Sequence, residues 1–376
     1  MPPKSICLVA GEPSGDVHGS LLVAELKKRH PDWDLWGVGL SRMAAAGCRL
    51  WQDATGWAVM GFAEVLGSLW NFRQRLALLT AEIERRKPDG LILIDFPGFN
   101  LKLAPRAHRA GIPILYYIVP QIWAWGLGRI RIFQHYIDRA VAVFPFEAEF
   151  FTRHNVKTDW VGHPLVDSVR AVADRETLRT LFGLKPGHCL IALMPGVRPQ
   201  DFQQHFPLFR DTVRLVSESI PNVHAVIAVN PKLQAAMPSL SAGPAGLSCT
   251  TDVYELLTAA DLVLTKTGTT TVEAAICGTP MITAYRTGAI NFAIARALVD
   301  VPFIAMPNLI ANRRLVPEFI QSAATPSALA AEAITLLTDE SARERQRTGL
   351  AEVKKRLGPP GAVRRAADVV EEWLKV

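Results

Sequence analysis

Short apolar runs alternate with amphipathic stretches along the first 160 residues. The apolar runs, which predict strands, lie at 5–10, 91–95, 114–119 and 139–144. Patterns typical of helices lie between them at 19–29, 72–87 and 101–110. Continuous apolar strands separated by helices are typical of a parallel sheet that is covered on both faces. This half of the chain is therefore expected to form a doubly wound α/β domain.

The same alternation restarts after Lys185-Pro186-Gly187. It predicts strands at 190–194, 223–229, 262–265 and 281–284, and helices at 201–220 and 269–277. Residues 326–376 have a helical pattern, with a break at 358–361 and a last helix near 362–375. The prediction is two doubly wound Rossmann-like domains, 1–165 and 166–345, with a linker near 162–187. The helices of about 346–376 are expected to pack back on the first domain.

Length and composition fit this picture and exclude several classes of protein. A chain of 376 residues suits two domains. The net charge of +6 is not gathered into a run, so no nucleic-acid partner is expected. No apolar run approaches the roughly 18–20 residues of a membrane span, and the first apolar segment is interpreted as a strand and not as a signal peptide. Five cysteines without a CxxC pair favour a reducing cytoplasm. The histidine spacings predict no metal site, and no cofactor is expected.

Eight of the nine tryptophans lie before residue 161. One interpretation is a tryptophan-rich core. The other is a half that meets something large and apolar, such as an acyl chain or a membrane interface. The sequence leaves both open.

Ligands of parallel sheets bind beyond the carboxyl ends of the strands. The first such place is the glycine-rich segment 11–19, whose candidate catalytic residues are Ser14, Asp16 and His18. The alternative is a capped turn with Ser14 or Asp16 as the helix N-cap, and a structural histidine. The second place is Asp95, an acid at the end of a buried strand, where a general base should lie. The alternative there is a loop or N-cap aspartate.

Two further places follow predicted strands of the second half. Gly196 and Arg198 come after the strand at 190–194, and a guanidinium there suits a diphosphate. The alternative is a surface arginine in a turn. The second place comprises Thr267, Gly268, Thr269 and Glu273.

The segment 267–273 opens a predicted helix. Its backbone N–H groups and hydroxyls can bind an anion without any lysine, and Glu273 can hold a ribose diol. The alternative is a capping box formed by Thr270 and Glu273. Together the four places describe a cleft between two domains, one with a base and one with a nucleotide-diphosphate site. That layout suits glycosyl transfer from a nucleotide sugar.

Nine short motifs in order make the chain resemble the lipid-A-disaccharide synthases of Gram-negative bacteria. They are V-A-G-E-x-S-G-D at 9–16, A-V-M-G-F-x-E-V-L at 58–66, I-D-x-P-x-F-N at 94–100, P-Q-x-W-A-W at 120–125, F-P-F-E at 144–147, V-G-H-P at 161–164, P-G-x-R at 195–198, T-G-T-x-x-x-E at 267–273 and P-N-L-I-A at 307–311. The resemblance implies a metal-independent GT-B glycosyltransferase. It would join UDP-2,3-diacylglucosamine to 2,3-diacylglucosamine 1-phosphate with inversion, giving a β-1,6 disaccharide phosphate and UDP.

The resemblance also implies roles for the candidate residues. Asp95 is the general base, and Arg198 engages the donor diphosphate. The turn 267–269 and Glu273 lie at the nucleotide, and Asn308 lies near the donor. Ser14, Asp16 and His18 lie on the cleft floor.

The chain departs from the family pattern at several positions, most of which are expected to contact substrate: Gly98, Val119, Gly126, Val197, Asp201 and Thr267. These departures leave three alternatives open. One is a related GT-B enzyme that transfers a UDP-linked aminosugar to a different acceptor. Another is a UDP-sugar epimerase on the same plan, and the third is a member that binds without turnover.

Residues 57–86 carry apolar and aromatic side chains, including Phe62, Leu69 and Trp70, that lead into arginines. Such a segment can lie at a lipid surface or pack into the first domain's core. The diacylated substrates implied by the resemblance favour the former. We therefore expect a cytoplasmic enzyme held peripherally at the inner membrane, and a homodimer stays open.

Overall fold

A computed structural model describes residues 3–55, 57, 65–124, 126–196, 198–229, 247–289, 292–293, 296 and 301–375, with backbone only for 65–69. The chain divides into two units. The first unit is Met1–Pro164 together with Leu357–Val376, and the second unit is Leu165–Arg356. Among the described residues, no helix is long and apolar enough to cross a membrane.

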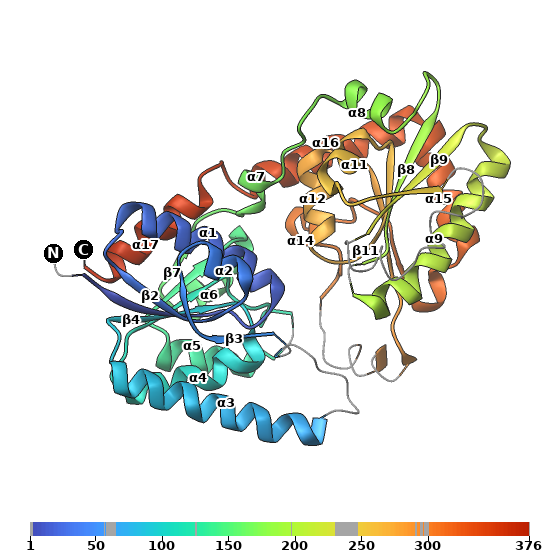
Figure 1. Cartoon of the computed structure of the whole chain (residues 1–376). Coiled ribbons are helices and arrows are strands. Elements are labelled where there is room, and N and C mark those ends of the chain that lie inside the picture. The colour runs from blue at the N-terminus through green and yellow to red at the C-terminus, as the bar shows by residue number, and fades with distance from the viewer. Residues whose placement is uncertain are drawn as a thin grey trace. The chain divides into compact units, whose positions relative to one another are not determined.

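The first unit is built on a parallel sheet in the order β3-β2-β1-β4-β5-β6-β7 (Figure 1). Its strands are β1 (Ser5–Val9), β2 (Asp34–Gly39), β3 (Arg49–Asp53), β4 (Gly90–Ile94), β5 (Ile114–Tyr117), β6 (Arg139–Ala142) and β7 (Thr158–Trp160). Its helices are α1 (Pro13–Arg29), α2 (Ser41–Ala45), α3 (Val65–Arg86), α4 (Pro97–Arg109), η2 (Leu127–Arg129), α5 (Ile130–Tyr136), α6 (Pro145–Arg153) and α17 (Ala362–Trp373).

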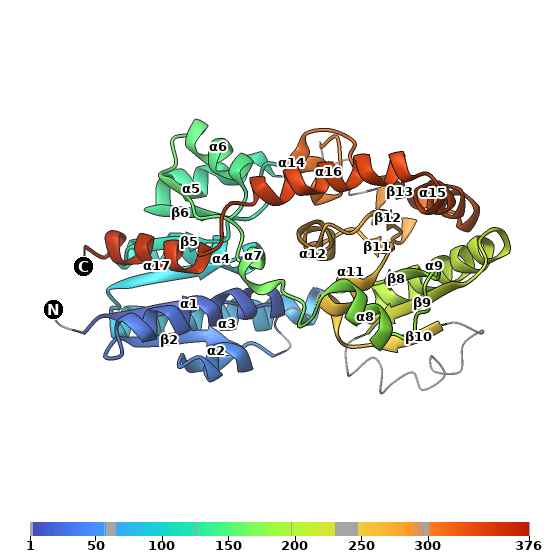
Figure 2. The same cartoon turned by 90° about the horizontal axis from the view of Figure 1, so that it is seen from above.

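Helices cover both faces of this sheet because its strands are apolar on both sides. Helices α1 and α17 pack on one face, and α3, α4 and α5 pack on the other (Figures 1 and 2). Within β1, Ile6 and Leu8 face the α1 side, whereas Cys7 and Val9 face the α3 side. The period-two alternation of strand side chains thus supplies two cores from one strand.

Helix α17 closes the first unit from the far end of the chain. Ala366, Ala367 and Val370 are buried in the α1-side core. Arg29 of α1 makes ion pairs with Asp368 at 2.6 Å and with Glu371 at 3.0 Å. The last helix is therefore an integral layer of the first unit.

The second unit repeats the plan with a parallel sheet in the order β10-β9-β8-β11-β12-β13. Its strands are β8 (Cys189–Met194), β9 (Val223–Ala228), β10 (Leu247–Thr250), β11 (Leu262–Lys266), β12 (Met281–Tyr285) and β13 (Glu318–Ile320). Its helices are α7 (Leu165–Ser168), α8 (Arg175–Leu181), α9 (Pro199–Ser219), α11 (Val253–Ala259), α12 (Thr269–Cys277), α14 (Met306–Ala311), η4 (Gln321–Ala323), α15 (Pro326–Thr338) and α16 (Glu340–Arg356).

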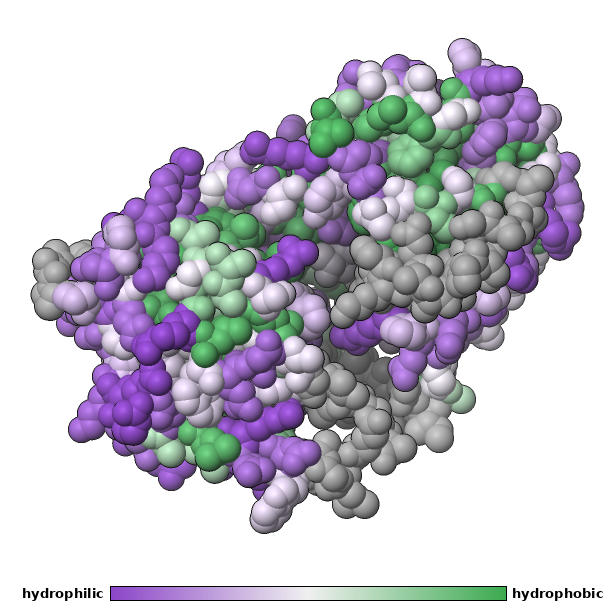
Figure 3. Space-filling model, in the orientation of Figure 1, coloured by the Kyte–Doolittle hydropathy of each residue, from purple (hydrophilic) through white to green (hydrophobic). Residues whose placement is uncertain are grey.

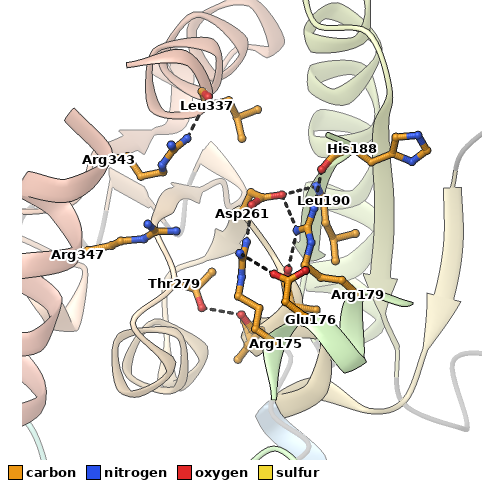
Figure 4. A network of polar contacts seen from close by, with 12 residues as sticks. Arg175, Glu176, Arg179, His188, Leu190, Asp261, Thr279, Leu337, Arg343 and Arg347 are labelled. Carbon is orange, nitrogen blue, oxygen red and sulfur yellow. Dashed lines mark hydrogen bonds and ion pairs between the residues drawn. The ribbon is translucent and has the colours of Figure 1, made fainter. Parts of the chain in front are cut away.

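A polar network links the elements at the amino-terminal ends of strands β8 and β11 of this second sheet (Figure 4). Asp261, directly before β11, accepts hydrogen bonds from the Leu190 backbone at 2.8 Å, from Arg175 at 2.5 Å and from Arg179 at 2.9 Å. Arg347 extends from α16 toward the same carboxylate. The network ties α8 to β8 and β11 at the edge opposite to the one where ligands of such sheets bind.

The predicted two-domain Rossmann-like α/β fold is confirmed. The eight predicted strands, which correspond to β1, β4, β5, β6, β8, β9, β11 and β12, lie within a residue or two of their predicted ranges. Strands β2, β3, β7, β10 and β13 were not predicted. The first helix begins at Pro13 and not near Gly19, so most of the expected loop at 11–19 is the first two turns of α1.

Candidate active site

Each sheet has one point where the strand order reverses. In the first unit it lies between β1 and β4, and in the second between β8 and β11. The helices that follow two such strands lie on opposite faces of the sheet, so a crevice opens at their carboxyl ends. The predicted site segments follow these four strands.

Asp95 is the first residue after β4, and its backbone is held in an unusual conformation. Asp95 and Phe96 both have left-handed φ angles, of 46° and 49°. The Asp95 carbonyl oxygen accepts hydrogen bonds from the Tyr116 hydroxyl at 2.6 Å and from Asn100 Nδ2 at 2.7 Å. Left-handed backbone is costly for such residues and persists only where the surroundings hold it. These contacts fix the carboxyl at the crevice.

The environment of the Asp95 carboxyl keeps a proton bound to higher pH than usual. Burial, reinforced by the negative charge of Glu12, raises its pKa to about 6. Hydrogen bonds from Ser14 and from the Phe96 backbone oppose this shift. A carboxylate with a pKa near 6 is ionised at neutral pH and is a stronger base than an ordinary aspartate. The structure thus brings Ser14 and Asp95 together.

His18 lies one turn further along α1, beside a second histidine that the sequence analysis did not assign. Its ring centroid is 6.3 Å from that of His163, and its Nδ1 is buried without a hydrogen-bond partner. Burial lowers the pKa of His18 to about 4 and that of His163 to about 3. Both imidazoles are therefore neutral at physiological pH.

Asp16 has structural contacts in this unit that differ from the catalytic role predicted for it. Its buried carboxylate accepts hydrogen bonds from the backbone N–H groups of Leu40 at 2.8 Å, Arg42 at 3.1 Å and Met43 at 3.1 Å. These are the free donors at the start of α2, so Asp16 caps a helix other than its own. The interpretation of Asp16 as the cap of its own helix is wrong, since α1 begins after Glu12 with no side-chain cap. We assign Asp16 a structural role in place of the catalytic one.

Glu147 is the last residue of the motif at 144–147, and no role was predicted for it from the sequence. It is buried in the first turn of α6, and burial raises its pKa to about 8. Trp123 Nε1 donates to Glu147 Oε1 at 3.3 Å. The charge of Asp95 contributes to the raised pKa, so the two carboxyls interact. At neutral pH Glu147 is mainly protonated.

In the second unit, the loop after β8 brings a glycine against an acid and leaves an arginine exposed. Gly196 has φ +111°, and a Cβ there would lie 2.6 Å from Asp201 Cβ. Arg198 is exposed at the start of α9, and its guanidinium forms no ion pair with a described residue. An unpaired guanidinium can bind a phosphate bidentately. Val197 lies outside the described residues.

The loop after β11 contains a glycine, Gly268, whose backbone conformation favours glycine over other residues. Gly268, with φ +152°, precedes α12, while Thr267 is buried and Thr269 is exposed. Glu273 accepts a hydrogen bond from the Tyr254 hydroxyl at 3.4 Å, and burial raises its pKa. The alternative prediction, a capping box formed by Thr270 and Glu273, is wrong, because the N-cap is Gly268 and no side chain caps α12.

The predicted anion site at 267–273, which was expected to need no lysine, has a lysine beside it. Lys266, the last residue of β11, lies with its Nζ 3.5 Å from Asp201 Oδ2 and 3.7 Å from the position of a Gly268 Cβ. It therefore joins the two loops of this crevice. The strand was predicted to end at Thr265, so Lys266 fell between the strand and the motif. With Arg198 it gives this edge a second cation.

Asn308 is fully buried, and its amide is saturated within the unit. Its Nδ2 donates to the Val316 carbonyl at 2.9 Å and to Glu318 at 2.8 Å, and its Oδ1 accepts from the Leu315 and Val316 backbones. No hydrogen-bonding capacity is left for a ligand. We therefore assign Asn308 the positioning of α14 in place of contact with the donor.

The described residues contain no group of three or more His, Cys, Asp or Glu side chains that could hold a metal ion. What they do contain is a carboxylate of raised pKa in one unit and an unpaired arginine, a lysine and glycine-rich backbone in the other. The first arrangement can accept a proton from a hydroxyl. The second can stabilise a departing phosphate.

Comparison with known proteins identifies the family. A family model described as Lipid-A-disaccharide synthetase matches residues 6–370. The chain is 37% identical to the lipid-A-disaccharide synthase of Geobacter sulfurreducens, over 98% of this chain and 97% of that one. It is 35% identical to the one from Myxococcus xanthus, over 99% and 98%.

Solved structures share the fold at low identity. The UDP-GlcNAc 2-epimerase from Neisseria meningitidis, bound to UDP-GlcNAc, has a TM-score of 0.65 at 12% identity, covering 98% of this chain and all of that one. CalG4, the calicheamicin glycosyltransferase, has a TM-score of 0.64 at 17% identity, covering all of this chain and 99% of that one. These likenesses identify the GT-B type fold, and the sequence relatives identify the activity: the chain belongs to the lipid-A-disaccharide synthase family of hexosyltransferases.

Proposed function

We propose that this enzyme joins UDP-2,3-diacylglucosamine to 2,3-diacylglucosamine 1-phosphate, giving the β-1,6-linked disaccharide 1-phosphate and UDP. The observation that carries the proposal is the Asp95 carboxyl, held at the first unit's crevice with a pKa of about 6. An inverting transfer needs one base, which takes the proton of the attacking sugar hydroxyl. Asp95 is that base, and Ser14 orients it through the hydrogen bond to its carboxyl.

The second unit binds the donor. Arg198 and Lys266 neutralise the diphosphate, and the backbone of Thr267, Gly268 and Thr269 adds N–H groups at the start of α12. Glu273 accepts the ribose hydroxyls, and Gly196 leaves room for the phosphates. As the C1–O bond of the donor breaks, the electron pair moves onto the β-phosphate oxygen, where these cations stabilise it. That the donor and acceptor sites face one another across a cleft stays a prediction of the family resemblance.

We also place the enzyme peripherally at the cytoplasmic face of the inner membrane, since both substrates carry acyl chains. The helix α3 supports this placement. Trp70 is 73% exposed and Leu78 is 51% exposed. Most of the other described apolar side chains of the predicted membrane segment instead follow the alternative of packing into the core: Trp57, Leu76, Leu79 and Ile83 are buried there. Phe62 and the side chain of Leu69 are not among the described parts of the chain. The sequence leaves open whether the protein is a homodimer, and light scattering would measure its oligomeric state.

One assay tests the reaction. The protein is incubated with both diacylglucosamine substrates in detergent, UDP release is followed, and the lipid product is analysed by mass spectrometry. The disaccharide 1-phosphate and UDP are expected in equal amounts. UDP without a disaccharide, or a donor whose sugar has been epimerised, would contradict the proposal and favour the epimerase.

A further inference from the structure

Four arginines of the second unit surround the partly buried carboxylate of Asp261 (Figure 4). Arg175 and Arg179 come from α8, and Arg343 and Arg347 come from α16. In each helix the two arginines are four residues apart, which places them on one face of that helix. Figure 4 shows the α8 pair on one side of Asp261 and the α16 pair extending toward it from the other. We call these four side chains the arginine cluster.

The arginines of α8 occupy most of the hydrogen-bonding capacity of Asp261. Its Oδ1 accepts a hydrogen bond from Arg175 at 2.5 Å, and its Oδ2 accepts one from Arg179 at 2.9 Å and one from the Leu190 backbone at 2.8 Å. Arg179 also donates to the His188 carbonyl at 2.6 Å. One carboxylate that is already bound to two guanidiniums cannot neutralise the charge of two more.

The arginines of α16 have weaker partners. Arg343 pairs with Glu340 and donates to the Leu337 carbonyl at 3.1 Å, but its Nε is buried without a hydrogen-bond partner among the described residues. Within the described part of the chain, Arg347 pairs with Glu344 alone, at 3.9 Å, which is too long for a hydrogen bond. Both glutamates are exposed, so water screens their charges. The α16 side of the cluster therefore has donors that lack close acceptors.

The cations of the cluster also repel one another. Burial, and then the charges of Arg343 and Arg175, lower the pKa of Arg347. The charges of Glu344 and Asp261 oppose this shift without cancelling it. A buried donor without a partner is rare in folded proteins and often marks the place of a bound ion or water. An anion at this place would relieve the repulsion and would supply the missing acceptors.

The cluster is not part of a broad basic surface. Figure 3 shows hydrophobic side chains on the surface around α8, and Leu181 at the end of this helix is exposed. The four arginine side chains are partly exposed, from 12% for Arg179 to 37% for Arg175. Partial burial strengthens electrostatic attraction, because less water screens it, while the remaining exposure gives a small ion access. The cluster therefore suits a small anion better than an extended polyanion.

We propose that the arginine cluster binds a phosphate dianion, either free or as part of a small phosphomonoester. Arg343 donates to it through Nε, and Arg347 and Arg175 donate through their guanidinium forks. A tetrahedral oxyanion accepts hydrogen bonds from several directions, and planar guanidiniums bind it bidentately. The site lies at the amino-terminal ends of β8 and β11, whereas the proposed donor site follows their carboxyl ends. It is thus a second anion site, independent of the proposed reaction.

Titration of the intact protein and four variants with inorganic phosphate tests the proposal. Arg347→Gln removes one cation of the cluster, and Arg347→Lys keeps the charge without the planar fork. Arg345→Gln removes an exposed arginine of the same helix and is the matched control. Arg198→Ala shows whether phosphate binds at the proposed donor site instead. Affinity is measured by calorimetry and by thermal melts at constant ionic strength, set with chloride, and a second series uses glucose 1-phosphate.

We expect phosphate to raise the Tm of the wild type above the value in chloride. Arg347→Gln should bind phosphate roughly tenfold to a hundredfold more weakly, as the loss of one charge-assisted contact implies. Arg347→Lys should lie between this variant and the wild type, because a lysine supplies a point charge without the fork. Arg345→Gln and Arg198→Ala should bind as the wild type does. UDP release should be the same in the wild type and the three α16 variants.

Three results would overturn the proposal. Equal phosphate affinity in Arg347→Gln and Arg345→Gln would exclude the cluster as the site. Loss of binding in Arg198→Ala alone would assign the phosphate to the proposed donor site. A wild type that phosphate stabilises no more than chloride does would leave the arginines only their role of linking helices to the sheet.

Two further results would support the proposal and identify the form of the ligand. Binding of inorganic phosphate alone would show a site for the free ion, and binding of glucose 1-phosphate as well would extend it to phosphomonoesters. If Arg347→Gln melts early in chloride, the comparison is made with Arg347→Lys, which keeps the charge of the cluster.

Discussion

The two units have the same strand plan and the same kind of crevice, but the chemistry at their carboxyl edges is opposite. The edge of the first unit gathers acids into partly apolar surroundings, so that Asp95 and Glu147 both have raised pKa values. The edge of the second unit carries Arg198 and Lys266 beside glycine-rich backbone. The carboxyls at the first edge therefore hold their protons more tightly than they would in water, whereas the second edge attracts anions.

The difference teaches that the fold supplies a place and the loops supply its charge. A base needs partial burial, because burial raises its affinity for a proton. A diphosphate site needs accessible cations and free N–H groups, because the ligand brings its own negative charge. Exchanging the loops would place a cation beside a base and lower the pKa of that base. The predictions that follow each disturb one side of this contrast.

The largest effect is expected at Asp95. Asp95→Asn removes the base while keeping the shape of the side chain, so turnover should fall by the ~10²–10⁴ typical of general-base loss. UDP release measures it. Affinity for UDP, measured by calorimetry, should not change, because the proposed UDP site lies in the other unit. Wild-type turnover in this variant would show that another group takes the proton.

Lys266→Ala should weaken UDP binding by roughly tenfold to a hundredfold, since a charge-assisted contact contributes about 1.5–3 kcal/mol. Arg198→Ala should have an effect of similar size. The affinity for uridine, which lacks phosphates, should not change in either variant. Lys185→Ala, at an exposed lysine of the same unit, is the control. If Lys266→Ala lowers the melting temperature and leaves UDP affinity intact, the lysine serves only its ion pair with Asp201.

Asp16→Ala should destabilise the first unit by about 1–3 kcal/mol, because it leaves buried backbone donors of α2 without an acceptor. Denaturant unfolding measures the change. The folded fraction should keep its kcat, as a structural role requires. A folded variant with turnover reduced a hundredfold would restore the catalytic role first predicted for Asp16.

Glu147 should make stability depend on pH. Its pKa rises from an ordinary 4.5 to about 8 on folding, so the folded state holds a proton that the unfolded state has lost. The free energy of unfolding should therefore fall as pH rises between these values. Glu147→Gln should flatten that fall, measured by chemical denaturation across the range. An unchanged pH dependence would mean that Glu147 is already ionised in the folded protein.

The smallest effect concerns the pH profile of turnover. The proposed base, Asp95, can accept a proton only when it is ionised, so turnover should drop as pH falls through about 6. Glu12→Gln removes a negative charge that contributes to the raised pKa and should move this limb to lower pH. Glu149→Gln, at an exposed acid of α6, should leave the limb in place. If the acid limb does not move in Glu12→Gln, that limb does not report the ionisation of Asp95.

The sequence predicted eight of the strands well, because a continuous run of apolar residues is typical of a strand that is covered on both faces. It missed β2, in which Gly37 and Gly39 interrupt the pattern, and the short edge strands, whose side chains are partly exposed. The position of Asp95 followed from the end of a buried strand. The partners of Asp16 and Asn308 could not be predicted, since a side chain's spacing does not say whether it turns to a ligand or to a distant backbone.

The second unit is inserted into the first, which the chain leaves after Pro164 and rejoins at Leu357. This has a consequence for synthesis on the ribosome. The strands of the first sheet are made before the second unit, whereas α17, which covers part of one face of that sheet, is made after it. The apolar side chains that α17 covers therefore have no partner from that helix while the second unit is being made. A stop codon shortly before Ala362 would leave the part of that face under α17 uncovered, while the second unit would keep all of its elements.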